Sequence, residues 1–145
     1  MISFFKSLLA PKAQTVNDPI TIALLSVLGK QLRLLGYEYE QVPPLEPYIS
    51  KDCRGYLMGI AHGIIQCEGR RVTKRDIEDA VLISFILVFG KNSGPNLALK
   101  TIVEFEPGSG LAQGYVFGTH EVEAIYGSGA SFFATGFHLF ATQEK

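Results

Sequence analysis

The fold is decided by the stretch Ile77-Glu-Asp-Ala-Val-Leu-Ile-Ser-Phe-Ile-Leu-Val-Phe89, which is apolar almost all the way round a helix. Thr73 and Asp76 precede it as a capping box in which Asp replaces the usual Glu, and Gly90 follows as a stop. A helix without a polar face is normally buried on all sides. We therefore predict a helix over 77–89 at the centre of a bundle.

Two more helices are predicted upstream of this stretch. The first runs from about Asp18 to Leu35, where Asp18 is a good N-cap and Pro19 suits the first helical position. The second runs from about Ser50 to Cys67. Three prolines mark residues 37–49 as a loop between them.

The C-terminal part is less clearly patterned. Residues 93–106 contain a β-branched, partly alternating segment, but Ser93 and Pro95 can open a helix, which we favour. Apolar residues recur at helical spacing over 110–126 and again over 130–140. Glycine- and aromatic-rich strands from 111 onward are the alternative. The prediction is an all-α fold, a compact bundle of five to six helices forming a single domain over 18–145.

Residues 1–17 are predicted to be an N-terminal arm and linker. Ile2, Phe5, Leu8 and Leu9 would share one side of a short amphipathic helix, and a polar linker begins at Pro11. Such an arm can dock on its own domain, on a neighbouring subunit or on a membrane surface. We favour docking on its own domain.

Two ladders of glycines are the most distinctive feature. Gly55, Gly59 and Gly63 recur every fourth residue, as do Gly114 and Gly118, with Gly110 in or near a turn. Each glycine inside a helix costs up to about 1 kcal/mol relative to alanine, so close packing must offset the loss. Spacing by four puts each ladder on one helix face. The ladders are expected to pack on each other, on a partner subunit or around a flat ligand.

The ladders also suggest an internal duplication. The segment 55–62 resembles 114–120 with one residue deleted, and 27–30 resembles 88–91 at nearly the same offset. Duplication would give two related helical halves packed about a pseudo-two-fold axis. Such short matches also arise by chance, so both explanations stay open.

Few polar residues are candidates for chemistry. The candidates are two tyrosines and two histidines beside the glycine ladders: Tyr56, His62, Tyr115 and His120. A pseudo-two-fold axis would bring them together as a ligand-binding site. His120 is followed by Glu121 and Glu123, but this spacing is not a His-Glu-x-x-His zinc motif. We assign no catalytic residue, no metal ligand and no cofactor.

Composition narrows the functional classes. The net charge of −1 gives no general attraction to nucleic acid, and the run 80–90 is too short to span a membrane. Cys53 and Cys67 lie fourteen residues apart in one predicted helix, about 21 Å, so they cannot form a disulfide there. This pattern indicates a cytoplasmic protein with reduced thiols.

The leading functional hypothesis is a non-enzymatic interaction or regulatory module that self-associates, as a homodimer or larger homo-oligomer, or binds another protein. The alternative is a small-molecule or metal-binding protein, conceivably an enzyme, with its site near the two Gly-Tyr-x-x-Gly helices.

Overall fold

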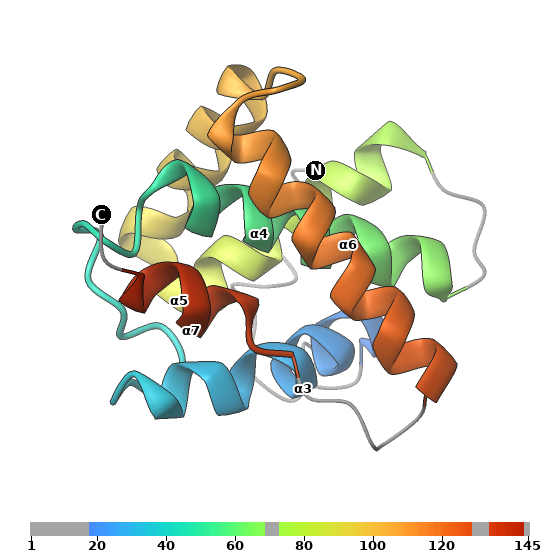
Figure 1. The fold of residues 1–145 in the computed structure, drawn as a ribbon, viewed down its shortest axis with the longest axis horizontal. Helices are drawn as coiled ribbons and strands as arrows, with labels where there is room; N and C mark the ends of the chain where they lie inside the picture. The colour runs from blue at the N-terminus through green and yellow to red at the C-terminus, as the bar shows by residue number, and fades with distance from the viewer. Residues whose placement is uncertain (1–17, 69–72, 129–133, 144–145) are drawn as a thin grey trace.

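The structure, a computed structural model, describes residues 18–68, 73–128 and 134–143. These residues form helices and no strands, which confirms the all-α prediction (Figure 1). The predicted N-terminal arm and residues 130–133 lie outside the described residues. Residues 134–135 are described and are not helical, so the last helix begins at Gly136, later than predicted. The helices are α3 (Pro19–Leu34), α4 (Lys51–Cys67), α5 (Lys74–Glu104), α6 (Gly110–Ser128) and α7 (Gly136–Thr142).

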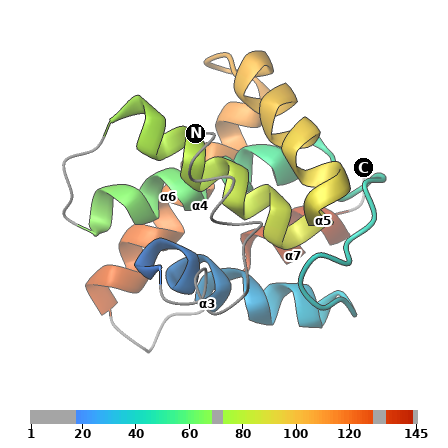
Figure 2. The same cartoon turned by 180° about the vertical axis from the view of Figure 1, so that it is seen from behind.

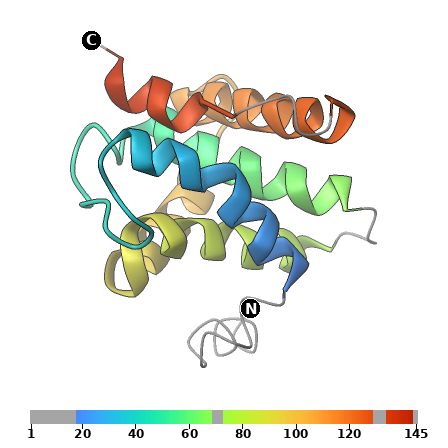
Figure 3. The same ribbon diagram turned by 90° about the horizontal axis from the view of Figure 1, so that it is seen from below.

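The helices stack in three layers, which Figure 3 shows edge-on. α6 and α7 form one outer layer, α3 and α4 the middle one, and α5 the other outer layer. α4 contacts every other described helix and is the hub of the fold. The 77–89 stretch is buried along most of its length, as predicted, although α4 and not this helix contacts every other described helix.

Side chains cap the starts of α3, α4 and α5, close to where these helices are predicted to begin. Asp18 accepts a hydrogen bond from the Ile20 amide at 3.3 Å. Ser50 accepts one from the Cys53 amide at 3.2 Å. Thr73 and Asp76 exchange both bonds of a capping box, each 3.1 Å long. These local bonds fix where α3, α4 and α5 begin.

Gly90 divides α5 into two helical segments, and the first of them ends there as predicted. Its φ of 89° and ψ of 172° are not helical, yet the chain resumes a helix at once and stays helical to Glu104. Figure 2 shows the sharp turn between the first half of α5 (74–89) and the second half (91–104). The loop between α3 and α4 caps the C-terminal end of the first half. The Glu40 and Val42 amides donate to the Leu87 and Val88 carbonyls at 2.7 and 3.1 Å. The helix favoured over 93–106 is thus confirmed up to 104.

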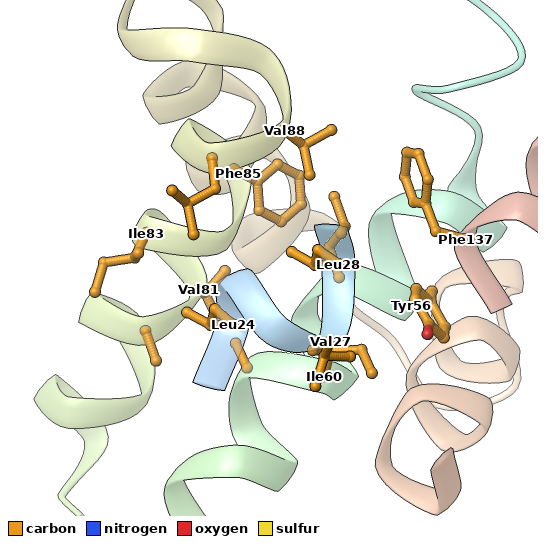
Figure 4. Close-up of a cluster of buried hydrophobic side chains, with 14 of the residues drawn as sticks. Leu24, Val27, Leu28, Tyr56, Ile60, Val81, Ile83, Phe85, Val88 and Phe137 are labelled. Carbon is orange, nitrogen blue, oxygen red and sulfur yellow. The ribbon is translucent and has the colours of Figure 1, made fainter. Parts of the chain in front are cut away.

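A single hydrophobic core joins the middle layer to α5 and α7. Figure 4 shows Leu28 of α3, Ile60 of α4, Phe85 of α5 and Phe137 of α7 converging there. All four side chains are fully buried or nearly so. Burying a side chain of this size contributes roughly 1.5–3 kcal/mol, so these contacts hold the layers together.

A buried arginine ties the second half of α5 to α4. Arg54 donates from Nη1 to Thr101 Oγ1 at 3.1 Å and to Glu104 Oε1 at 2.8 Å. Its Nε donates to the Ile49 carbonyl at 2.8 Å. Because a buried guanidinium needs such partners, this network orients the segment beyond the Gly90 break.

Candidate functional site

The two glycine ladders face each other where α6 crosses α4 (Figure 1). A methyl group added at Gly55 would overlap the Leu111 carbonyl, and one at Gly59 would overlap the Tyr115 carbonyl. From the other helix, a methyl at Gly118 would lie 2.6 Å from the Tyr56 carbonyl oxygen. The missing side chains therefore let the two backbones touch.

The remaining rungs continue the same contact. A methyl at Gly114 would overlap the Asp52 carbonyl, and one at Gly63 would lie 3.0 Å from Val122 Cβ. Of the three placements expected from the sequence, the structure has the first, with the ladders packed on each other. The close contact offsets the low helix propensity of glycine.

A buried polar network lies along one flank of the α4–α6 contact. The Tyr56 hydroxyl donates to Glu121 Oε1 at 2.5 Å and accepts from Gln31 Nε2 at 3.0 Å. Gln31 Nε2 also donates to the Val27 carbonyl at 3.1 Å. Three helices, α3, α4 and α6, thus meet at one tyrosine hydroxyl, and we call these residues the Tyr56 network.

The same network holds the beginning of α7. Glu121 accepts from the Thr135 and Gly136 amides at 3.0 and 2.9 Å. Gln31 Oε1 accepts from the Phe137 amide at 2.8 Å. The first amides of a helix have no partner inside the helix, and a carboxylate there also suits the helix dipole. Side chains from α3 and α6 therefore replace the missing local cap of α7.

The Tyr56 network has few chemical options. Burial first, and then the neighbouring Glu121, raise the pKa of Tyr56 well above its usual value, so the hydroxyl stays protonated. The Gly136 backbone covers its ring so closely that a side chain there would overlap it. Phe117 and Phe140 pack against the ring with centroids 6.3 and 6.2 Å away. The arrangement suits a rigid connector and gives a substrate no access to the hydroxyl.

A second polar pair lies on the opposite flank. Tyr115 and His62 are hydrogen-bonded through the hydroxyl and Nδ1. Phe105 packs edge-on against Tyr115 with ring centroids 5.3 Å apart. Burial lowers the pKa of His62 and raises that of Tyr115, so both groups are neutral at pH 7. Both side chains are partly exposed.

The four candidate ligand residues do not form one site. Tyr56 belongs to one flank, His62 and Tyr115 belong to the other, and His120 is exposed. On α6, Tyr115 and Phe117 lie on opposite sides of the glycine ladder, each about 100° from the nearest glycine. Phe117 packs against Tyr56, so Tyr56 and Tyr115 have different surroundings. Among the described residues no three His, Cys, Asp or Glu side chains are grouped to hold a metal ion.

Two residues of the Tyr56 network were not among the predicted site residues. Gln31 falls on the same helix face as Leu24 and Leu28, where a lone polar residue signals a buried hydrogen bond. Glu121 follows Gly118 by three residues, which puts it on the ladder face. These positions in the sequence carry the signal, but only the fold identifies their partners.

The proposed duplication receives no support at its second match. Gly29 lies inside the regular helix α3, whereas Gly90 has positive φ at the break in α5. Two positions related by duplication are expected to keep similar backbone conformations, so the match over 27–30 and 88–91 is best explained by chance.

The surface hollows of the described residues include two beside helix ends. One, of about 180 Å³, lies between the N-terminal ends of α3 and α5 and the C-terminal half of α4. The other, of about 550 Å³, is open to solvent and is lined by Lys30, Arg33, Leu34, Ala134 and Thr135. Neither adjoins both flanks of the α4–α6 contact.

Comparisons with protein families, with curated proteins and with solved structures found no match. None of the described helices has the length and apolar character that crossing a membrane requires.

Proposed function

We propose that this protein is a non-enzymatic interaction module that self-associates through the outer face of the second half of α5. The observation that carries the proposal is a pair of exposed aliphatic side chains, Leu99 and Val103, which are 58% and 75% exposed. Residues four apart on a helix are neighbours, so the two form one apolar patch. We call them the Leu99–Val103 patch.

The patch is carried by a well-anchored helix. On the opposite side, Gly94, Ala98 and Thr101 are buried. Arg54 holds the end of this helix through Thr101 and Glu104. A patch on a fixed support loses little conformational entropy on binding, which favours association.

The charges beside the patch support a second copy of the chain as the partner. Lys100 and Glu104 follow Leu99 and Val103 by one residue each, so both lie on the same flank of the patch. When two such helices meet antiparallel about a two-fold axis, each Lys100 comes opposite the Glu104 of the other copy. The face is therefore self-complementary, as an isologous interface requires.

The ligand-binding alternative has less support. The polar atoms of the Tyr56 network bond to one another and to α7, and His62 bonds Tyr115. The smaller hollow, about 180 Å³, is below the roughly 300 Å³ typical of ligand pockets. The larger one, about 550 Å³, is open to solvent and is lined by none of the four predicted ligand residues.

The proposal also includes a cytoplasmic location. It is supported by Cys53 and Cys67, which form no disulfide with each other.

The first experiment is native mass spectrometry with analytical ultracentrifugation of the full chain and of Val103→Asp. We expect the wild type to dimerise and Val103→Asp to be monomeric, because a carboxylate in an apolar interface loses its solvation. Lys100→Glu should weaken the dimer at least several-fold, because it then faces the partner's Glu104.

The matched control is Leu34→Asp, an aliphatic side chain on another helix with 66% exposure. It should leave the dimer intact. A wild-type chain that stays monomeric at 100 micromolar, about the upper range for a specific weak dimer, would refute the proposal. A reproducible bound mass or stoichiometric metal on His62 and Tyr115 would instead favour the ligand-binding alternative.

A further inference from the structure

The smaller hollow has the character of a receptor for an amphipathic segment. Its floor is apolar and is formed by Ile20, Ile65, Ala80 and Ile83. Asp18, Asp76 and Asp79 complete its lining, so the three carboxylates outnumber Arg75, which lies close enough to Asp79 to offset part of the pKa increase that burial causes there. We call this hollow the acid-rimmed groove.

The size of the groove fits one large apolar side chain. Its volume is about 180 Å³, and an apolar cavity of about 150 Å³ is enough to hold a benzene ring. A single aromatic ring or leucine side chain would fill the floor. A cation beside that side chain would meet the carboxylates of the rim.

The N-terminal segment of this chain has the complementary composition. Residues 1–17 contain Lys6 and Lys12 and neither Asp nor Glu. Phe5 lies on the apolar stripe predicted for this segment, and Lys6 is its next neighbour. The segment ends directly before Asp18, which is itself part of the groove.

We propose that the acid-rimmed groove is the docking site for the chain's own N-terminal segment, with Phe5 on the apolar floor and Lys6 beside the carboxylates. Phe5 lies thirteen positions before Asp18, a reach of at most about 45 Å, so the tether spans the groove easily. A tether this short gives an effective concentration in the millimolar range, which favours the chain's own segment over that of a second copy.

Docking at this position would cover the beginnings of two helices. Asp18 caps α3, and Asp76 belongs to the capping box of α5. Burial raises the pKa of Asp79, and a nearby lysine would favour its charged form. The segment would thus act as a strap across α3, α4 and α5, independently of the Leu99–Val103 patch.

The test is hydrogen exchange by mass spectrometry on the full chain. The substitutions are placed in the N-terminal segment, because Asp18 and Asp76 also cap helices and changing them would disturb the fold. Phe5→Asp should speed exchange of amides 77–83 several-fold, and Lys6→Glu should do so to a smaller extent. Ser3→Asp adds the same charge on the opposite side of the predicted helix and should leave exchange unchanged.

Three outcomes would overturn the proposal. In the first, Phe5→Asp and Ser3→Asp leave the groove amides equally protected. In the second, protection in the wild type is lost on twentyfold dilution, which would assign the docked segment to a second copy. In the third, residues 1–17 gain protection only when vesicles containing anionic lipid are added, which would make the segment a membrane anchor. Protection that is independent of concentration and lost with Phe5→Asp supports docking within the chain.

Discussion

At the scale of single residues, burial sets the protonation of His62. Its pKa is lowered by desolvation, and its Nδ1 is hydrogen-bonded to the Tyr115 hydroxyl. The folded state therefore holds the His62 proton less tightly than the unfolded chain, whose histidines titrate near pH 6.5. The lowered pKa of His62 therefore leaves the free energy of unfolding unchanged above that pH and reduces it below that pH.

This linkage predicts a pH dependence of stability. As the pH falls from 7.5 to 5, unfolded chains protonate His62 before folded ones do, so the free energy of unfolding should decrease. His62→Gln should lose less stability over the same interval than the wild type does. Urea denaturation at both pH values measures the difference.

The exposed His120 provides the control. His120→Gln makes the same substitution at an imidazole that is exposed to solvent. If His62→Gln and His120→Gln behave alike, desolvation of His62 does not contribute to stability.

At the scale of helices, glycine has opposite effects at different positions. Gly59 touches the Tyr115 backbone across the α4–α6 contact, whereas no atom of the described residues lies within 4 Å of a methyl group placed on Gly127 in α6. The same substitution by alanine therefore separates helix propensity from packing.

Gly59→Ala should destabilise the protein by about 1–3 kcal/mol, because the added methyl forces the α6 backbone away from α4. Gly127→Ala should raise stability, by at most about 1 kcal/mol, through helix propensity alone. Thermal and urea denaturation of both variants provide the comparison. A Gly59→Ala variant as stable as Gly127→Ala would contradict the ladder contact.

The break in α5 also belongs to this scale. Gly90 has φ 89° and ψ 172°, a region that only glycine enters readily. An added methyl group there would also lie 3.1 Å from the Glu40 carbonyl oxygen. The glycine allows the second half of α5 to turn away and to carry the Leu99–Val103 patch.

At the scale of the whole molecule, the Tyr56 network joins α3, α4 and α6 to α7. Tyr56→Phe removes one donor from Glu121 and leaves Gln31 Nε2 without its tyrosine acceptor. A buried polar group that loses its partner costs about 1–3 kcal/mol, and we expect a loss of that size. Glu121 and Gln31 also hold α7. In Tyr56→Phe, hydrogen exchange should therefore speed up more for the amides of α7 than for those of α4.

Tyr126→Phe is the matched control, since the Tyr126 hydroxyl bonds Glu68 at 2.6 Å but the side chain is 41% exposed. Its effect should stay within about 0.5 kcal/mol. Equal effects of the two substitutions, measured by urea denaturation, would show that the buried network adds no more than a surface bond.

Local signals in the sequence are enough to locate most of the helices. Capping bonds reach only three residues, so Asp18, Ser50 and Thr73 can be recognised as helix starts without any tertiary information. The prediction that Gly90 ends the 77–89 helix is confirmed, because two helical segments meet across a kink at this residue. The path of the chain beyond Gly90 depends on contacts of Glu40, Val42 and Arg54, which lie far away in the sequence.

The candidate site was predicted only in part, for a related reason. Spacing by four placed the glycines on helix faces, but it could not say whether the facing surface belongs to the same chain. Tyr56, His62, Tyr115 and His120 were grouped by similarity of sequence. The crossing of α4 and α6 places the Tyr56 network on one flank and the His62–Tyr115 pair on the other.

The sequence by itself determined the all-α class, the starts of α3, α4 and α5 and the small faces of α4 and α6, because periodicity and capping act over a few residues. Only the tertiary structure decided that the ladders pack on each other, that Gln31 and Glu121 hold α7, and that α4 is the hub. Those outcomes depend on which faces meet across long separations in the chain, and that choice is made by packing the whole core at once.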